Sequence, residues 1–213
     1  MRIAVIGTGS VGRTLAQALQ GAGHDVVVGT RDPDATSARE EWIGLGVPLQ
    51  QLALVAADAD LVINATNGGA SLAALGEVGS DHLAGKVLLD VANPLDFSQG
   101  FPPTLSVKDT DSLAEQIQRA FPDAKVVKSL NTMNASVMVD PASLGDGDTT
   151  VFAASDDAEA RRVVVGLLRE LGWVDIVEMD GLQNARGLEM WLPLWVRLMG
   201  PLGTAQFNLK LVR

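Results

Sequence analysis

The 213-residue chain contains no cysteine and no tyrosine, and only two histidines, His24 and His82. The absence of cysteine excludes disulfides, thiolate metal sites and a cysteine nucleophile. Two histidines cannot make a multi-histidine centre, so we expect no metal site. Without tyrosine, a reductase that pairs tyrosine with lysine is excluded. No serine lies in a nucleophile elbow and no acid pair has hydrolytic spacing, which disfavours hydrolases.

Positive charge and long apolar runs are also scarce. The chain has 16 Lys and Arg residues against 26 Asp and Glu residues, for a net charge of -10. This surplus repels nucleic acid and anionic membranes, so neither is expected as a partner. No apolar run is long enough to span a bilayer, and the N-terminus runs into a strand pattern without a charged-then-apolar leader. We therefore expect a cytoplasmic protein with a small-molecule substrate.

Aromatic residues make up only 4% of the chain, whereas glycine occurs 22 times. This composition favours an α/β protein with tight turns between strands and helices. Strand patterns alternate with helical ones, including helices over residues 11–22, 35–44 and 158–171 and one that begins after Ser112. The alternation predicts a doubly wound parallel Rossmann sheet with helices on both faces. The predicted strands are residues 2–7, 25–29, 60–64, 86–91, 125–130, 150–154 and 174–179.

Two segments depart from this alternation. Residues 93–111 form a long stretch rich in Pro and Gly, which is typical of a functional lid or binding loop. Residues 182–199 are apolar on several sides and contain Pro193, which should kink a helix. We expect residues 181–213 to form a small C-terminal helical segment that contributes to a homodimer interface and the substrate pocket. The alternative for this segment is an ordinary core helix.

The turn after the first strand fits the pattern G-x-G-x-x-G. Gly7 permits the tight turn, Gly9 lets a pyrophosphate approach the backbone, and Gly12 lets helix and strand pack closely. The free N–H groups and the helix dipole favour an anion at this helix start. The alternative is a glycine-rich turn without a ligand. The predicted dinucleotide contacts are Gly7, Thr8, Gly9, Ser10, Val11 and Gly12.

The second predicted strand ends in Thr30 and Arg31, where NAD-binding proteins usually carry an acidic residue. A guanidinium can bind a phosphate with charge-assisted hydrogen bonds, and a threonine hydroxyl can donate another. Residues 1–180 are therefore predicted to form a Rossmann domain that binds NADP(H) rather than NAD(H). Arg13 could add positive charge. The alternative is a solvated loop arginine beside Asp32 and Asp34.

The next three strands end in small, uncharged polar residues. Because the carboxyl ends of parallel strands line the ligand crevice, these residues are expected to fix the nicotinamide carboxamide by hydrogen bonds. The alternative is that Asn and Pro only terminate the strands. The predicted contacts are Ala65, Thr66, Asn67, Asn93, Pro94, Asn131 and Met133.

Few side chains are available for acid–base catalysis. Lys86 begins a strand, so it should lie at the edge opposite the cofactor. Lys128 lies near the correct end of its strand, where it is either functional or a strand lysine that snorkels at a sheet edge. We expect no catalytic side chain. A hydride transfer in which solvent supplies any proton suits this inventory.

Several segments together resemble the NADPH-dependent reductases of coenzyme F420, an 8-hydroxy-5-deazaflavin. They are GTGSVGRTLAQAL, GHDVVVGTRD, VVKSLNTM and GLQNARGLEMWLPLWVRL, in the same order and at similar spacing along the whole chain. The resemblance implies a homodimer joined by the C-terminal part. It also implies that NADP binds at the glycine turn and the Thr-Arg element, with the deazaflavin stacked on the nicotinamide. Hydride then passes between the nicotinamide C4 and the deazaflavin C5.

The chain departs from this family in the residues after the third strand and in having few clustered basic residues for the second substrate. Archaeal members tend to have a proline and a bulky aromatic residue where this chain has Asn67-Gly68-Gly69, which we expect to be open, flexible backbone. Candidate cations for the phosphate and polyglutamate tail of F420 are Lys108, Arg186 and Arg197. Two alternatives remain: an NADPH-dependent reductase of another small acceptor, such as a flavin or carbonyl compound, and a non-catalytic NADP(H) sensor. Imine-reducing and β-hydroxyacid dehydrogenase families share the first motif but need a larger helical domain.

Overall fold

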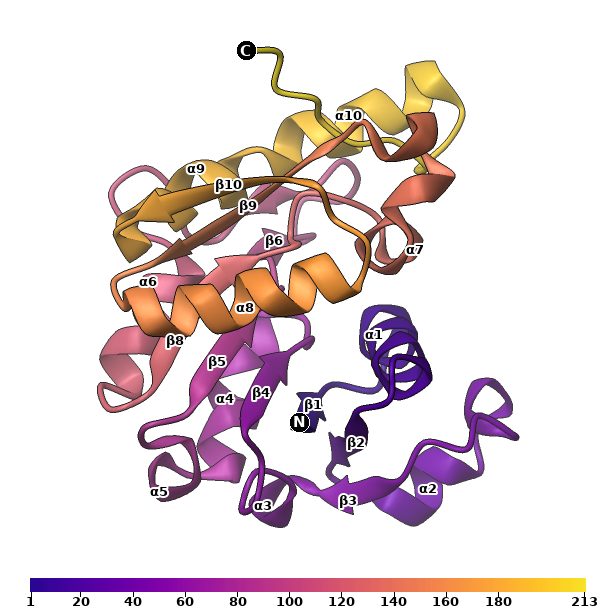
Figure 1. The fold of residues 1–213 in the computed structure, drawn as a ribbon, viewed down its shortest axis with the longest axis vertical. Helices are drawn as coiled ribbons and strands as arrows, with labels where there is room; N and C mark the ends of the chain where they lie inside the picture. The colour runs from indigo at the N-terminus through magenta and orange to yellow at the C-terminus, as the bar shows by residue number, and fades with distance from the viewer.

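The computed structural model describes residues 1–213 and is built around one eight-stranded sheet, with a separate two-stranded ribbon (Figure 1). The central strands are uninterrupted apolar runs because both of their faces are covered by helices. In spatial order the strands are β10 (Asp175–Asp180), β9 (Thr150–Ser155), β8 (Lys125–Ser129), β5 (Val87–Asp90), β4 (Leu61–Asn64), β1 (Arg2–Ile6), β2 (Asp25–Thr30) and β3 (Leu49–Gln51).

Six of these strands, from β3 to β8, are parallel and have the Rossmann order. Counted along the chain, the order is 3-2-1-4-5-6, which confirms the predicted fold class. The strand order reverses between β1 and β4, and ligands of such sheets bind at the carboxyl ends of the strands at this point.

The last two strands run the other way. β8 and β9 pair antiparallel, with Lys128 opposite Ala154 and Ser129 opposite Ala153, so the expectation of a wholly parallel sheet is wrong at this edge. A parallel β9 would require a crossover that carries the chain back along the full length of β8. The connection contains only the five-residue helix α7 (Ala135–Val139) and two short 3₁₀ helices, η2 (Pro141–Ser143) and η3 (Gly145–Gly147). A helix of that length spans about 7 Å, less than half the length of β8.

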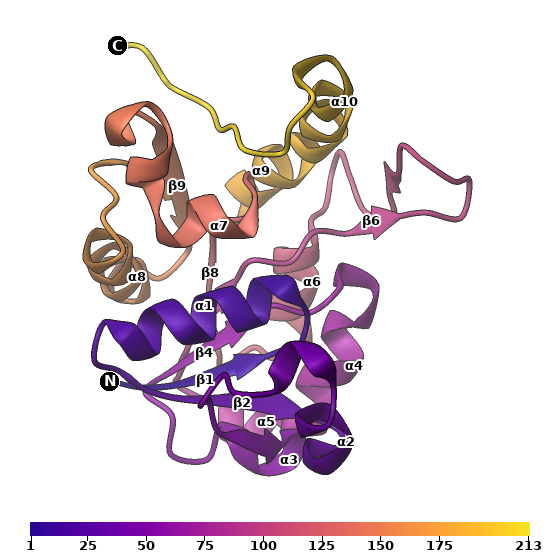
Figure 2. The ribbon, with the colours of Figure 1, turned by 90° about the vertical axis from the view of Figure 1, so that its right-hand side faces the viewer.

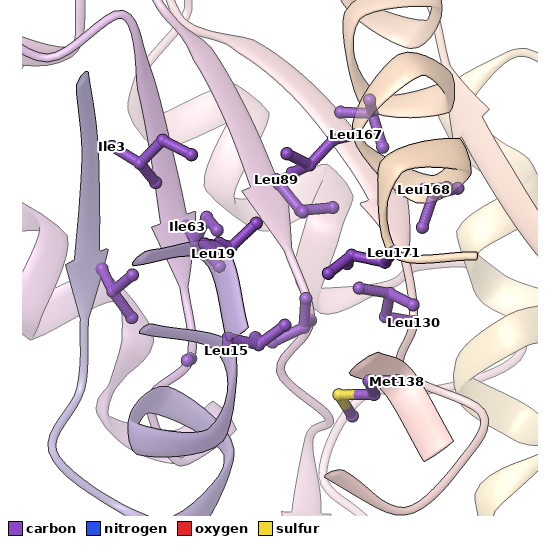
Figure 3. Packing of buried hydrophobic residues seen from close by; sticks show 14 of the residues in the cluster. Ile3, Leu15, Leu19, Ile63, Leu89, Leu130, Met138, Leu167, Leu168 and Leu171 are labelled. Atoms are coloured by element: carbon purple, nitrogen blue, oxygen red, sulfur yellow. The ribbon is translucent and has the colours of Figure 1, made fainter. Parts of the chain in front are cut away.

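Helices cover both faces of the sheet, and the sheet separates the hydrophobic core into two clusters. Figure 2 shows α1 above β1, β2 and β4 and α3 and α5 below them. On the first face, Leu15 and Leu19 of α1 meet Leu167 and Leu168 of α8 around Leu89 (Figure 3). The helices on this face are α1 (Ser10–Gly21), α7 and α8 (Ala158–Glu170). Those on the second are α3 (Leu52–Val55), α4 (Gly68–Val78), α5 (Ser80–Leu83) and α6 (Leu113–Ala120).

Several short elements have no counterpart in the sequence prediction. The edge strand β3 is one, and the ribbon of β6 (Leu95–Asp96) and β7 (Thr104–Leu105) within the expected loop 93–111 is another. The expected helix 35–44 is shorter, and consists of α2 (Pro33–Ser37) and the 3₁₀ turn η1 (Glu40–Trp42). The helix predicted after Ser112 is α6, and Ser112 caps it: its hydroxyl accepts a hydrogen bond from the backbone N–H of Glu115 at 3.1 Å.

The C-terminal segment consists of η4 (Leu182–Asn184), α9 (Ala185–Met190) and α10 (Leu192–Leu202). The helical run breaks at Trp191, and Pro193 lies in the first turn of α10, where a proline costs no hydrogen bond. Leu182 and Ala185 belong to the second core cluster, whereas α10 projects beyond the sheet (Figure 1). No helix in the structure has the length and apolar character that crossing a membrane requires.

Candidate functional site

Two cavities lie side by side at the carboxyl ends of the parallel strands, and both are lined by Thr66. The first has a volume of about 230 Å³ and the second about 180 Å³. The first cavity is lined by Ile6, Gly7, Thr8, Gly29, Thr30, Arg31, Asp32, Arg39, Leu52, Thr66, Ala70 and Ala74. The second cavity is lined by Val11, Ala65, Thr66, Asn67, Gly68, Val91, Ala92, Asn93, Leu95, Asn131, Met133, Met138 and Leu192.

The glycine turn between β1 and α1 has the geometry of a phosphate-binding loop. Gly7 has a φ of +125°, and a Cβ there would lie 2.5 Å from the carbonyl oxygen of Ala65. A Cβ on Gly12 would lie 2.0 Å from the carbonyl oxygen of Gly7. Gly9 is different, because no protein atom lies within 4 Å of the position that a Cβ would occupy. Gly9 is also the N-cap residue of α1, so no side chain hydrogen-bonds to the first N–H groups of this helix from that position. The start of α1 therefore offers free N–H groups and open space, which fits a pyrophosphate.

The segment after α2 folds over this turn. Arg39 Nη1 donates to the Thr8 hydroxyl at 3.2 Å, and the Trp42 indole N–H donates to the Thr8 carbonyl at 3.2 Å. Arg13 Nη1 donates to the carbonyl of Glu41 at 2.8 Å. Arg13 thus anchors this segment and lines neither cavity, whereas Arg39 lines the first. Sequence reasoning missed Arg39 because no motif fixes the distance between the end of β2 and a cation in the following loop.

The first cavity carries the predicted Thr-Arg element at the end of β2. Thr30 is buried, and its hydroxyl lies 2.7 Å from that of Thr36 in α2. Arg31 is exposed and its Nε donates to Glu77 Oε1 of α4 at 3.0 Å. With Arg39, two guanidinium groups therefore line this cavity, and either can bind a phosphate with charge-assisted hydrogen bonds.

The second cavity is lined by amides and apolar side chains. Asn93 and Asn131 hold each other: Asn93 Nδ2 donates to the Asn131 carbonyl and Asn131 Nδ2 to Asn93 Oδ1, both at 2.9 Å. Asn131 Nδ2 also donates to the carbonyl of Leu188 in α9 at 3.0 Å. The buried Asn131 Oδ1 accepts no hydrogen bond, an arrangement that carries a cost unless a ligand supplies the donor. A carboxamide N–H is such a donor.

The expectation of open backbone at Asn67-Gly68-Gly69 is wrong. Asn67 caps α4, with its Oδ1 accepting from the N–H of Gly69 at 3.0 Å. Gly68 is buried, and a Cβ there would lie 2.1 Å from the Asn93 carbonyl oxygen and 2.9 Å from the Pro94 Cα. The glycine lets the ends of β4 and β5 approach closely, and Pro94 contributes to this contact rather than to a cavity wall.

Lys128 is fully buried and lies far from any sheet edge, so the snorkelling interpretation is wrong. Its ammonium contacts Asp90 Oδ2 at 2.7 Å and Glu189 Oε1 at 2.9 Å, which joins β8, β5 and α9. Glu189 also accepts from the backbone N–H groups of Leu113 and Ala114 at the start of α6. Burial lowers the pKa of Lys128, but the charges of Asp90 and Glu189 outweigh it and the pKa is raised. Lys128 is therefore a buried cation that fixes the C-terminal segment to the sheet.

The other lysine and arginine residues considered in the sequence analysis differ in their contacts. Lys86 donates to backbone carbonyls that precede β4, at the edge opposite the cavities as predicted. Arg186 forms a two-point ion pair with Glu115, at 2.9 and 2.6 Å, and is committed to that contact. Lys108 and Arg197 are exposed and have no carboxylate partner.

Most predicted site residues lie around the two cavities. Gly7, Thr8, Thr30 and Arg31 line the first, Thr66 lines both, and Val11, Ala65, Asn67, Asn93, Asn131 and Met133 line the second. Gly9, Ser10, Gly12, Arg13 and Pro94 line neither cavity. Besides Arg39, the residues that sequence reasoning missed include Leu52, Ala70 and Ala74 in the first cavity and Leu95, Met138 and Leu192 in the second. These small or apolar residues carry no chemical signal, and only the fold brings them to the site.

The Rossmann sheet, its glycine turn and the two adjacent cavities at the strand ends are typical of a dinucleotide-binding oxidoreductase. Residues 2–94 match the family model described as NADP oxidoreductase coenzyme F420-dependent. The F420-dependent NADP reductase of Methanothermobacter marburgensis is 32% identical over 209 residues, which covers 93% of this chain and 92% of that protein. The chain belongs to the coenzyme F420-dependent NADP oxidoreductase family, and it is an oxidoreductase.

Two further proteins are similar to this chain. A crystal structure from Arthrobacter sp. FB24, provisionally named F420-dependent NADP-reductase, has a TM-score of 0.97 and 56% identity and matches both chains over 100% of their lengths. Rat metalloreductase STEAP3 is 30% identical over 198 residues, which is 91% of this chain but only 38% of that protein. The chain therefore corresponds to well under half of the metalloreductase.

Proposed function

We propose that this protein transfers a hydride between NADP(H) and coenzyme F420. The observation that carries the proposal is the pair of adjacent cavities: the first is lined by the guanidinium groups of Arg31 and Arg39, and the second is lined by Asn131, whose buried amide oxygen has no donor. A dinucleotide that lies across the turn at Gly9 would place its phosphorylated adenosine in the first and its nicotinamide in the second. Membership of the family and 32% identity to a named F420-dependent NADP reductase support the second substrate.

The protein's own residues bind and orient the two substrates. The start of α1 holds the pyrophosphate, Thr30 and Arg31 receive the 2′-phosphate, and Asn131 fixes the carboxamide so that the ring cannot rotate. Leu95, Met133, Met138 and Leu192 exclude water from one side of the second cavity. When both substrates are bound, the nicotinamide C4 supplies the hydride that the deazaflavin C5 accepts, and solvent supplies the balancing proton. No side chain is assigned an acid–base step.

The proposal is tested by mixing the purified protein with NADPH and F420 and following the loss of the deazaflavin's visible absorbance. Turnover supports hydride transfer to F420. Turnover only with a flavin or a carbonyl compound would replace it with the second candidate, an NADPH-dependent reductase of another small acceptor. Dinucleotide binding without turnover by any acceptor would indicate a sensor.

The cofactor preference has its own test in Arg31→Ala. Loss of the guanidinium should weaken NADPH binding by about 10-fold or more, the worth of a charge-assisted contact, and leave NADH binding nearly unchanged. Isothermal titration with both dinucleotides measures this. An equal loss for NADPH and NADH would refute the 2′-phosphate assignment.

The proposal includes a homodimer formed through the C-terminal segment, with residues 1–180 as the NADP-binding part and residues 181–213 as the part that completes the substrate cavity. Leu192 of α10 lines the second cavity, while Met190, Leu194 and Leu202 are exposed on the same segment. Exposed apolar side chains that gather on one helix are typical of an interface. A cytoplasmic location remains a prediction, as does the absence of nucleic-acid partners that the acidic composition indicates.

A further inference from the structure

At Arg31, the first cavity contains an ion pair that opposes the binding of a phosphate. Arg31 Nε donates to Glu77 Oε1 at 3.0 Å, across the space between the end of β2 and α4. Ala70 and Ala74 line the cavity from α4, and Glu77 follows at the next position of the same helix face. Glu77 therefore stands at the rim of the first cavity, on the side opposite the Thr-Arg element.

Glu77 is the only carboxylate that pairs with a cation of this cavity. Arg39 contacts the neutral hydroxyl of Thr8 and has no carboxylate within ion-pair distance. Asp32 also lines the cavity, but its Oδ1 accepts from the backbone N–H of Ala35 and caps α2. Arg39 is thus a standing cation of the cavity, whereas Arg31 is neutralised as long as Glu77 holds it.

We propose that Glu77 competes with the 2′-phosphate for Arg31, so that cofactor binding exchanges one anionic partner of the guanidinium for another. This inference rests on the proposed NADP(H) function. Glu77 then sets how tightly the phosphorylated dinucleotide binds and how far it is preferred over the unphosphorylated one. It is a specificity-determining residue that does not itself bind the cofactor.

Geometry and charge both favour exchange over joint binding. A phosphate that grips a guanidinium with two hydrogen bonds from the Nε side needs the Nε–H that Glu77 occupies. Two anions on one guanidinium also repel each other. The Arg31 and Glu77 side chains are 67% and 44% exposed, so the exchange requires no rearrangement of the core.

The test is Glu77→Gln, which removes the charge and keeps the length and a hydrogen-bonding amide. Dissociation constants are measured by isothermal titration for 2′,5′-ADP and 5′-AMP, which probe the adenosine end alone, and for NADPH and NADH. We expect 2′,5′-ADP and NADPH to bind about twofold to fivefold more tightly, the range that exposed ion pairs contribute. Binding of 5′-AMP and NADH should stay within error.

Asp81→Asn is the matched control, because it removes one exposed negative charge on the neighbouring helix α5 without touching Arg31. It should leave all four constants unchanged. In an Arg31→Ala background, Glu77→Gln should lose its effect. Unchanged or weaker NADPH binding in Glu77→Gln would overturn the proposal and make Glu77 a group that orients Arg31. Failure of the NADP(H) function is seen separately, as an unmodified protein that binds 2′,5′-ADP and 5′-AMP equally.

Discussion

At the scale of single residues, Gly9 and Gly12, the second and third glycines of the motif, meet different surroundings. An added Cβ at Gly12 would collide with the carbonyl oxygen of Gly7 at 2.0 Å, whereas at Gly9 it would meet no protein atom within 4 Å. The backbone of Gly9 has a φ of -75°, which alanine adopts without strain. The fold therefore requires glycine at position 12, whereas at position 9 only a ligand would require it.

Replacement by alanine should separate the two roles. Gly12→Ala should destabilise the protein by about 1–3 kcal/mol because the turn must move. Gly9→Ala should keep the melting temperature and weaken NADPH and NADH alike, because the methyl group enters the pyrophosphate space. Thermal unfolding and dinucleotide titration measure both effects. Gly21→Ala, with equally open space at the far end of α1, is the control and should bind normally. Full cofactor affinity in Gly9→Ala would argue against a pyrophosphate at this turn.

Lys128 provides a second prediction at this scale. Lys128→Met leaves Asp90 and Glu189 buried without their cation, which should cost about 3–5 kcal/mol of unfolding free energy. Lys125→Met on the same strand breaks the partly exposed pair with Asp157 at 3.2 Å and should cost less than about 1 kcal/mol. Urea unfolding compares the two variants. Equal, small losses would show that the buried cluster contributes little to stability.

Much of the site was predictable because the carboxyl ends of parallel strands meet at one edge. That rule alone brings Thr30 and Asn131 to the two cavities from the sequence. Arg39 and Glu77 were not predictable, since their positions depend on how η1 and α4 pack over the turn. Apolar periodicity in a sequence indicates which side chains of a segment are buried, and it gives no information about charged residues at the rim of a cavity.

At the scale of elements, the Arg186–Glu115 pair connects α9 to α6. Hydrogen bonds from Arg186, with a further one from Ser112, lower the pKa of Glu115 below its ordinary value of 4.5. A lowered pKa in the folded state stabilises the protein at every pH above 4.5, and this contribution is lost as the pH falls through the folded-state pKa. The docking of α9 should therefore weaken in acid.

Glu115→Gln tests this linkage because it cannot titrate. The unfolding free energy of the unmodified protein should fall more steeply between pH 5 and pH 3 than that of the variant. Other carboxyls with lowered pKa values, such as Asp175 and Asp157, titrate in both proteins and cancel in the comparison. Parallel curves measured by urea unfolding across this range would contradict the assignment.

The predicted strands were found, and the errors concern direction and very short elements. Period and apolar content do not tell whether a strand runs up or down, so the reversal at β9 followed only from the shortness of α7. A three-residue edge strand such as β3, and two-residue strands such as β6 and β7, are too short to show any periodicity. The interruption at Trp191 lies two residues before Pro193, where the sequence predicted a kink, and Pro193 itself lies in the first turn of α10.

At the scale of the whole molecule, the exposed apolar side chains of α10 predict a dimer. Leu194 is 50% exposed, and Leu54 on α3 is 52% exposed on a different surface. Leu194→Asp should convert a dimer of twice the 22.3 kDa chain mass to a monomer, because a charge in an apolar interface is costly. Leu54→Asp should leave the mass unchanged. Light scattering coupled to size exclusion measures it, and a monomeric unmodified protein would dismiss the dimer.

The reversed strands explain how the end of the chain reaches the site. Because β10 runs opposite to the Rossmann strands, it ends at the side of the sheet away from the cavities. The following segment, η4 and α9, therefore runs back toward the cavities. That return brings Glu189 to Lys128 and Leu192 to the wall of the second cavity. Substitutions confined to the final thirty or so residues would thus alter the wall of the second cavity and leave the lining of the first cavity unchanged, since no residue after Ala74 lines the first.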